Sequence, residues 1–478
     1  MQNWWSRPCG GRDVLKIALP LIISTASWSV MNFIDRMFLL WHSTEAMAAA
    51  MPAGLLHFSL VCFPLGLAQY TTTFVAQYHG AGRPERVGVA LWQGLWVGAI
   101  AAPLFLLTIP AAPALFHTAG HDAAVADLET VYFQILAFAG GAGVLAAAMA
   151  SFFTGRGKTH VVMVVDVTAA LMNVGLDYCL IFGNLGFPTW GMAGAAWATV
   201  ASMWFRVLAY GLLMSRSHLR RRYQLVEGCR YDRELMSRLF KFGAPNGLQL
   251  LLEVSAFSVF IVLVGHFGRE AMAATTLAFN INSLAWVPML GLGNAVTAMV
   301  GQQLGRNSPR LAARATWTAF LMAQAYLSTM ALLYVTVPDA FMLGHASGME
   351  RQPFSEIRDT VVVLLRFAAV YSLFDAMNLV FVSAIKGAGD TRFVLATTAV
   401  MSPLPVLIGW LGVRVFDGGL LWCWLVITVW ISLLGLIYLL RYLQGKWRRM
   451  RVIEAEYLAA PPARPTGDLP TSVPPEVF

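Results

Sequence analysis

Long apolar stretches recur along almost the whole chain, and short polar or basic segments separate them. Each stretch is long enough for a helix that rises about 1.5 Å per residue to cross a hydrocarbon layer about 30 Å thick. The short alternating segments typical of a membrane β-barrel are not the pattern here. The chain therefore predicts twelve membrane-spanning helices, over residues 14–40, 50–78, 88–116, 125–154, 160–183, 190–215, 239–265, 272–303, 311–338, 357–385, 392–415 and 419–443.

The composition agrees with an all-α polytopic membrane protein. Hydrophobic residues make up 58% of the 478 residues and charged residues only 12%, which leaves too little polar surface for a soluble protein. The first stretch lacks a small-residue cleavage site and contains Asp35, so we interpret it as a retained helix rather than a signal peptide. The five cysteines have no metal-ligand spacing, and the proline-rich end of the chain from Pro461 predicts a disordered tail.

Basic residues are concentrated in alternate connections between the predicted spans. Residues 216–241 carry eight of them and residues 441–451 another five, whereas the opposite connections carry four arginines among several acids. Since basic loops stay on the cytoplasmic side, both termini are predicted to lie in the cytoplasm. The same loops account for the net charge of +8, and we expect them to contact anionic lipid head groups rather than nucleic acid.

The two halves of the chain resemble each other. At an offset of 225 residues, identical residues coincide in several spans, and after an insertion near 340–355 the offset becomes 232. The matched pairs include Pro20 with Pro245, Gln77 with Gln302, Gly80 with Gly305 and Gly155 with Gly387. This predicts two parallel repeats of six helices. The expected organisation is an N-lobe over 1–215, a cytoplasmic linker over 216–236, a C-lobe over 237–443, and a basic then proline-rich tail over 444–478.

Four carboxylates lie inside apolar stretches: Asp35, Asp177, Glu253 and Asp375. An ionised acid within the hydrocarbon region costs several kcal/mol, so such residues usually face a wet cavity and mark an ion or substrate path. None of the four has an acidic counterpart in the other repeat. The predicted scaffold is symmetric, but its acidic groups are not.

Counting along the predicted spans places Asp35, Tyr132, Asp177 and Thr199 at one level in the outer half of the N-lobe. Asn173 lies one turn from Asp177 on the same helical face. These side chains offer only oxygen-rich groups, which suit a hard cation such as Na⁺, while a proton would need only one of the carboxylates. We therefore expect a cation-binding site here, and the choice between Na⁺ and H⁺ stays open.

A second acidic cluster is expected near mid-membrane in the C-lobe. Glu253 has Gln249 one turn before it, and Asp375 has Asn378 just under one turn after it. We interpret this cluster as a proton or substrate site.

Three intramembrane arginines, Arg36, Arg206 and Arg366, allow a plainer interpretation in which an acid forms a structural ion pair. That interpretation is reasonable for one acid but not for all four. Asp166 shares a helical face with Asp177 but lies near the inner surface, so we expect it to be solvated or to cap a helix. The string from Gly155 to Thr159 lacks the glycine and the strand of a phosphate loop, which predicts transport driven by a gradient rather than by a nucleotide.

Several runs resemble the signature of the multidrug and toxic compound extrusion (MATE) transporter family. They are Gly155–Thr159, Asn173–Tyr178, Ile181–Gly183, Gly191–Thr199 and the second-half echo Lys386–Arg392, together with Asp35. The resemblance covers about residues 12–443. It implies a V-shaped pair of six-helix lobes and cation-coupled export of small organic compounds, often cationic or aromatic, such as drugs.

The resemblance also implies roles for individual residues. Asp35, Asn173, Asp177 and Thr199 match the N-lobe cation-site pattern of the family, and Glu253 and Asp375 match the C-lobe acids of its NorM-like branch. Arg36 departs from the small or polar residue that usually follows the first aspartate. A member of this branch is expected to be a monomer in the bacterial inner membrane, with no cofactor apart from its coupling ion.

The sequence therefore favours an Na⁺- or H⁺-coupled antiporter. The main alternative is a flippase for lipid-linked sugars or head groups, which should have a basic central cavity. Here the intramembrane charges comprise four acids and only three arginines, which favours the export of small molecules. A channel is less favoured because the acids do not form a repeated ring. An enzyme is the least favoured class.

Overall fold

The computed structural model describes residues 4–118, 122–346, 351–416 and 418–458, and within these ranges every regular element is a helix. Twelve helical segments are long and apolar enough to cross a membrane, which confirms the predicted fold class and number of spans. The proline-rich segment predicted as a disordered tail lies outside the described residues.

The first six spans are built from eight helices, some spans being interrupted. These are α1 (Gly11–His42), α2 (Thr44–Gln69), α3 (Thr71–Gly80), α4 (Pro84–Leu106), α5 (Ala112–Thr118), α6 (Ala123–Gly155), α7 (Thr159–Phe182) and α8 (Met192–Met214). The short helix α9 (Ser217–Arg222) follows in the linker. The last six spans comprise α10 (Arg233–Gly265), α11 (Arg269–Gly305), α12 (Pro309–Thr336), α14 (Arg351–Ala388), α15 (Thr391–Met401), α16 (Pro403–Phe416) and α17 (Leu420–Leu443). The short helix α13 (Pro338–Ala346) lies between the spans formed by α12 and α14.

Local chemistry explains where several helices begin and end. Helix α10 starts at Arg233, earlier than the sequence predicts, because the Asp232 carboxylate caps it by accepting a hydrogen bond from the Leu235 N–H at 3.0 Å. The eleventh span divides into α15 and α16 at Pro403, which has no N–H to continue the helical bonds. Helix α7 ends at Gly183, whose φ of +72° is the left-handed conformation that glycine favours at a helix end.

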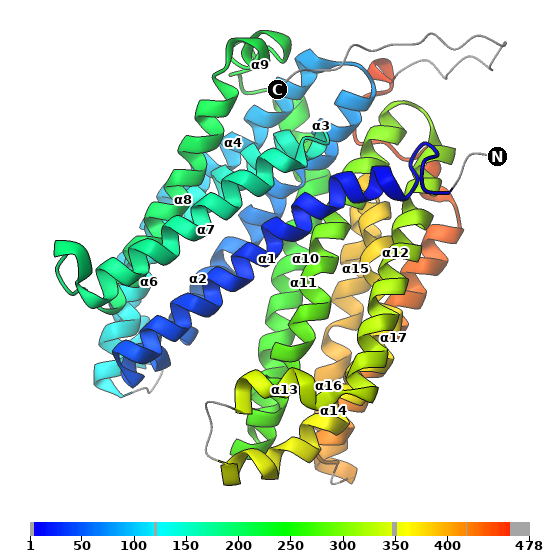
Figure 1. Ribbon diagram of the computed structural model, residues 1–478. Helices are drawn as coiled ribbons and strands as arrows, with labels where there is room; N and C mark the ends of the chain where they lie inside the picture. Colours follow the sequence, from blue (N-terminus) through cyan, green and yellow to red (C-terminus); the bar gives the residue numbers. More distant parts are fainter. Residues whose placement is uncertain (1–3, 119–121, 347–350, 417, 459–478) are drawn as a thin grey trace.

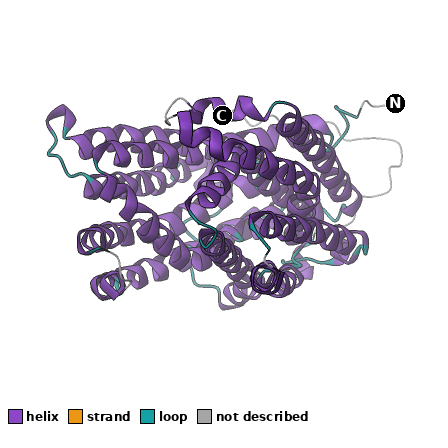
Figure 2. Ribbon diagram, turned by 90° about the horizontal axis from the view of Figure 1, so that it is seen from below, coloured by secondary structure: helices purple, strands orange, loops and turns teal. Residues whose placement is uncertain are grey.

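The helices form two groups that correspond to the two repeats. Helices α1, α2, α4, α6, α7 and α8 pack together, as do α10, α11, α12, α14 and α17. Between the groups, α1 and α3 pack against α11, and α2 packs against α10. The ribbons of the two groups approach each other at the end that carries α3 and α9 and diverge towards α13 (Figure 1). The view from below shows helices connected by short loops (Figure 2). We call the end with α3 the joined end.

Two pairs of repeat-related residues make the closest contact at the joined end. A Cβ atom on Gly80 would lie 2.1 Å from the carbonyl oxygen of Gln302, and one on Gly305 would lie 2.1 Å from the carbonyl oxygen of Gln77. Both distances are far inside van der Waals contact, so only glycine fits at either position. We call these four residues the glycine–glutamine seal.

Hydrogen bonds repeat the same symmetry. The Gln77 Nε2 atom donates to the carbonyl oxygen of Gly387 at 3.0 Å, and the Gln302 Nε2 atom donates to that of Gly155 at 2.8 Å. Each bond crosses from one lobe to the other, and the two are related by the sequence repeat. The duplicated chain thus forms an interface in which equivalent patches meet, as in a twofold dimer.

Candidate cation site

The structure brings Asp35 and Asp177 together, because α1 packs along α7 in the N-lobe. Asp177 has no exposed surface, and Asp35 is partly buried. The two carboxylates lie close enough for their charges to interact. The Oδ1 atom of each is buried and has no hydrogen-bond partner among the described residues. Since buried polar atoms are normally satisfied, two neighbouring carboxylate oxygens in this state indicate a place for a bound cation or proton.

Asn173 connects Asp177 to the neighbouring helix α8. With its amide oriented to suit both neighbours, its nitrogen donates to Asp177 Oδ2 at 3.1 Å and its oxygen accepts from the Thr199 backbone N–H at 3.3 Å. The sequence predicts the Thr199 hydroxyl at the site, but this contact runs through the backbone of Thr199. Tyr132 on α6 is buried within electrostatic range of both aspartates. All five predicted site residues therefore lie together, and their role in cation binding stays a prediction.

Arg36 places a positive charge beside this group. Its side chain is exposed, and its charge acts on both Asp35 and Tyr132. No ion pair links Arg36 to Asp35 in the described part of the chain. The arginine therefore modifies the field at the site without occupying the free carboxylate oxygens.

The second acidic cluster is divided into two pairs. Gln249 Nε2 donates to Glu253 Oε1 at 2.7 Å on α10, and Asn378 Nδ2 donates to Asp375 Oδ1 at 3.2 Å on α14. Asp375 is buried and Glu253 is exposed. Among the residues that the structure describes, no hydrogen bond or ion pair connects one pair to the other, and their role as a proton or substrate site stays a prediction.

Glu253 lies near the boundary between the lobes. Its charge acts on Lys386 of α14 and on Cys62 of α2, which belongs to the other lobe. Gln249 is buried, and its Oε1 atom has no hydrogen-bond partner in the described ranges. The pair on α10 therefore combines an exposed acid with a free amide oxygen at the interface.

Asp166 forms a structural ion pair with Arg206, which the sequence does not predict. Asp166 Oδ1 lies 2.9 Å from both Nε and Nη2 of Arg206, and it accepts a hydrogen bond from the Tyr210 hydroxyl at 3.2 Å. Its other oxygen accepts from the hydroxyl of Ser24 on α1. The expected solvated or capping role of Asp166 is therefore wrong.

The register of α7 and α8 contained a signal for this pair. Asn173 meets Thr199, and the two helices run antiparallel. Asp166 lies seven residues before Asn173, and Arg206 lies seven residues after Thr199, so the two fall at one level. The signal appears only once the Asn173 contact is used to align the two helices.

The ligand types favour a hard ion over a transition metal. The described residues contain no group of three or more His, Cys, Asp or Glu side chains arranged to hold a metal. Two carboxylates and an amide oxygen suit an alkali cation, and either carboxylate alone suits a proton.

Comparisons with known proteins agree with this architecture. The MatE family model matches residues 20–179 and 245–411, one block in each lobe and together more than half of the chain. A multidrug resistance MATE family transporter of the MOP superfamily, in an outward-facing conformation, superimposes with a TM-score of 0.82 and 20% identity over 92% of this chain and 96% of its own.

Two further solved structures are similarly close. A MOP superfamily transporter from Pyrococcus furiosus, described by the reverse polarity of its binding pocket, has a TM-score of 0.81 and 20% identity over 92% of this chain and 97% of its own. A MATE protein in complex with MaD5 has a TM-score of 0.80 and 19% identity over 94% and 99% of the two chains. At these identities the structures establish the shared fold. On the strength of the family match, this chain belongs to the MATE family of multidrug transporters.

Proposed function

We propose that this protein is an antiporter that couples the inward movement of Na⁺ or H⁺ to the export of small organic compounds, cationic or aromatic, such as drugs. The observation that supports it is the pair of buried, unbonded Oδ1 atoms on Asp35 and Asp177. Asn173 holds the second aspartate, and Tyr132 and Thr199 complete the surroundings. The bound ion would take its ligands from this group.

A cation would relieve the mutual repulsion of the two carboxylates and satisfy their free oxygens. Coupling requires that this ion bind the two states of the transporter with different affinity. Helix α1 offers a physical route, because it packs against α7 at the site and against α11 at the lobe interface. Its Thr25 hydroxyl reaches the Val287 carbonyl of α11 at 3.3 Å. Ion binding at Asp35 would then bias the position of α1 and, through it, the interface.

The test is transport by purified protein in liposomes with Na⁺ and H⁺ gradients varied separately. Asp35→Asn and Asp177→Asn should abolish ion-driven movement of a fluorescent cationic dye. Asp122→Asn is the matched control, since Asp122 is exposed in the connection before α6. Continued dye export by both site variants under an imposed ion gradient would refute the proposal.

The pair Gln249–Glu253 is proposed as a substrate or proton site. Its support is the exposed carboxylate beside the other lobe and the free Gln249 Oε1 atom. Glu253→Gln should weaken dye binding while leaving the ion dependence of transport in place. Asp375, which is buried on α14 and accepts a hydrogen bond from Asn378, is proposed to carry a proton rather than to contact the substrate.

The setting of this activity is also a proposal. The basic connections favour a bacterial cytoplasmic membrane with both termini and the joined end on the cytoplasmic side. The outer ends of the lobes would then be apart, which is an outward-facing arrangement. We propose that the protein works as a monomer among membrane lipids, without a nucleotide or other cofactor.

A second candidate is a flippase for lipid-linked sugars or lipid head groups. The observation that favours it is Arg36, an exposed cation beside the acidic site. A flippase should translocate a labelled anionic lipid in liposomes and depend on Arg36, whereas the antiporter should move the cationic dye and tolerate Arg36→Gln.

A further inference from the structure

Residues 446–458 form an ordered strap after the last span, which we call the C-terminal strap. It begins with a short 3-10 helix, Lys446–Arg449, and contains a second one, Ala455–Tyr457. The strap is attached to the C-lobe through Trp447, which is buried and stacks on Tyr442 of α17 at a centroid distance of 4.8 Å. Arg451 adds a hydrogen bond to Asn307, between α11 and α12, at 3.4 Å.

The strap crosses from the C-lobe to the N-lobe at Val452. The Val452 N–H donates to Gln77 Oε1 on α3 at 2.9 Å, while its carbonyl accepts from Arg238 Nη1 on α10 at 2.9 Å. Val452 and Ile453 are both buried. A single peptide segment therefore connects the two lobes, and it does so through Gln77, a member of the glycine–glutamine seal.

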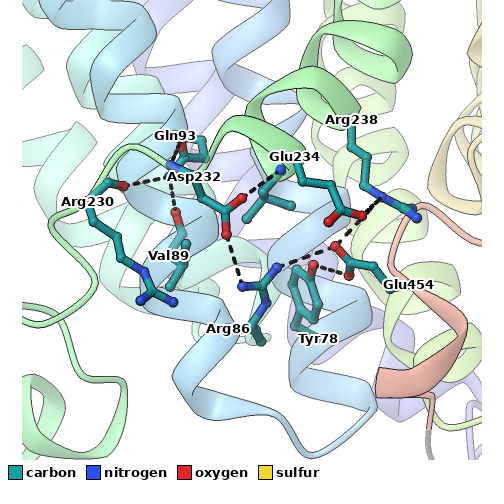
Figure 3. A network of polar contacts seen from close by, with 10 residues as sticks. Tyr78, Arg86, Val89, Gln93, Arg230, Asp232, Glu234, Arg238 and Glu454 are labelled. Atoms are coloured by element: carbon teal, nitrogen blue, oxygen red, sulfur yellow. Dashed lines mark hydrogen bonds and ion pairs between the residues drawn. The ribbon is translucent and has the colours of Figure 1, made fainter.

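Glu454 forms the polar centre of this crossing (Figure 3). Its carboxylate accepts a hydrogen bond from the Tyr78 hydroxyl at 2.6 Å and pairs with Arg86 at 3.4 Å, both from the N-lobe. It also pairs with Arg238 of the C-lobe at 3.6 Å. The side chain is only 10% exposed, so these charge-assisted contacts are shielded from water.

The cations that hold Glu454 each have a second acidic partner. Arg86 Nη1 lies 3.1 Å from Asp232 Oδ2, and Arg238 Nε lies 3.6 Å from Glu234 Oε1. If Glu454 left its place, neither arginine would become a buried charge without a partner. That matters because leaving one partner of a buried pair alone is what makes breaking such a pair costly.

The strap is also held unequally by the two lobes. Its attachment to the C-lobe is covalent, through α17, and apolar, through the stacked Trp447. Its attachment to the N-lobe consists of the bonds to Gln77, Tyr78 and Arg86, together with the Tyr457 ring, which lies 4.9 Å from the Arg86 guanidinium. Once the lobes separate, water can replace the partners of these polar groups, whereas it cannot replace the apolar partner of the Trp447 ring.

We propose that the C-terminal strap is a releasable brace that stays on the C-lobe, lets go of the N-lobe, and sets how readily the joined end opens. The inference rests on the proposed function only in that a transporter must open this end at some stage of its cycle. The strap would hold the joined end closed through Glu454 and would re-form the same contacts when the lobes return.

The test measures the separation of the lobes directly. Spin labels on His160→Cys and Arg310→Cys report on the joined ends of the N-lobe and the C-lobe, and both positions are exposed. Cys229→Ser removes the exposed native thiol, since the other four cysteines are buried. In this background, Glu454→Gln should raise the fraction of long inter-label distances about tenfold, because it weakens three charge-assisted contacts.

Two further variants keep the result interpretable. Glu456→Gln makes the same chemical change on an exposed residue of the strap and should leave the distance distribution unchanged. Tyr78→Phe removes the hydroxyl that binds Glu454 from the N-lobe side and should shift the distribution in the same direction as Glu454→Gln. If both Glu454→Gln and Tyr78→Phe are folded and match Glu456→Gln, the proposal is overturned.

The measurement needs neither ion nor substrate, so it is independent of the proposed function. Failure of the Asp35 and Asp177 variants to affect transport would leave the effect of Glu454→Gln on lobe separation in place. Conversely, an unchanged distance distribution would overturn the proposal of a brace and would not bear on the proposed cation site.

Discussion

Gln302 on α11 donates a hydrogen bond across the lobe interface to the backbone carbonyl of Gly155, at 2.8 Å. Its repeat counterpart, Gln77, does the same to Gly387 at 3.0 Å. The two bonds flank the close approaches of Gly80 and Gly305, where the other repeat leaves no space for a Cβ atom. The two repeats therefore contribute the same glutamine and glycine contacts to the joined end.

This closeness predicts the effect of a single added methyl group. Gly80→Ala and Gly305→Ala should each destabilise the joined end by about 1–3 kcal/mol, because the neighbouring atom is a backbone oxygen that cannot move aside. Thermal unfolding in detergent measures the loss. Gly143→Ala is the matched control, since a Cβ atom there would have no neighbour within 4 Å. Equal unfolding temperatures for Gly80→Ala and Gly143→Ala would contradict the prediction.

Two aspartates on α7 should respond oppositely to loss of charge. Asp166→Asn leaves the Arg206 guanidinium without its carboxylate, and we expect a loss of about 3 kcal/mol. Asp177→Asn removes a charge whose Oδ1 atom has no partner, so stability should stay the same or rise. Thermal unfolding of both variants provides the comparison. A large loss in Asp177→Asn would mean that this acid is structural rather than an ion ligand.

The pattern of apolar stretches was sufficient to predict the twelve spans, because span length is set by membrane thickness and by helix rise. The candidate cation site of the N-lobe was predictable because Asn173 and Asp177 share a helical face. The limits of the predicted spans then place Asp35, Tyr132 and Thr199 at the same depth. Pairing between helices was not predictable in the same way. The Asp166–Arg206 pair depends on the register of α7 against α8, which the spacing within one helix does not contain.

The strap and the seal were missed for related reasons. The repeat matched Gly80 with Gly305 but did not indicate that each would contact the other repeat. Residues 444–458 were interpreted from their basic character as a tail beside lipid head groups. Their apolar members Trp447, Val452 and Ile453, all buried, were the available signal that the segment folds back onto the lobes.

The contacts of Asp232 with the start of α10 and with Arg86 of α4 should make the stability of the protein depend on pH. Burial alone would raise the pKa of Asp232, but the Leu235 N–H and the Arg86 guanidinium outweigh it, so its pKa lies below the usual range. A depressed pKa means that the stabilisation is present above the unfolded-state value, near pH 4, and is lost as the pH falls below it.

Asp232→Asn should therefore lower stability by about 1 kcal/mol at neutral pH, with the difference from the parent shrinking below about pH 4. Unfolding temperatures measured across pH 3–8 provide the test. Glu227→Gln, at an exposed position in the same linker, should show no such pattern. A difference that stays constant down to pH 3 would argue against the contribution of the Asp232 charge.

Cys229 offers a direct test of orientation. It is the exposed one of the five cysteines, and it lies in the linker at the joined end. A membrane-impermeant maleimide should label it in inside-out vesicles but not in intact cells. Asp122→Cys in a Cys229→Ser background should show the reverse. Asp122 precedes the first residue of α6, whereas the last residue of α6, Gly155, lies at the joined end. Labelling of Cys229 from outside the cell would contradict the proposed orientation of the protein in the membrane.

The position of the C-terminal strap in the chain has a consequence for how the protein is made. The strap follows α17, so it emerges only after the last span has been synthesised. Until then Gln77, Tyr78 and Arg86, made long before, lack the contacts that Val452 and Glu454 later provide. A chain stalled or cut before residue 446 would hold twelve inserted helices whose lobes had never been braced. The contribution of the strap to the joined end is therefore added only when synthesis of the chain has passed residue 454.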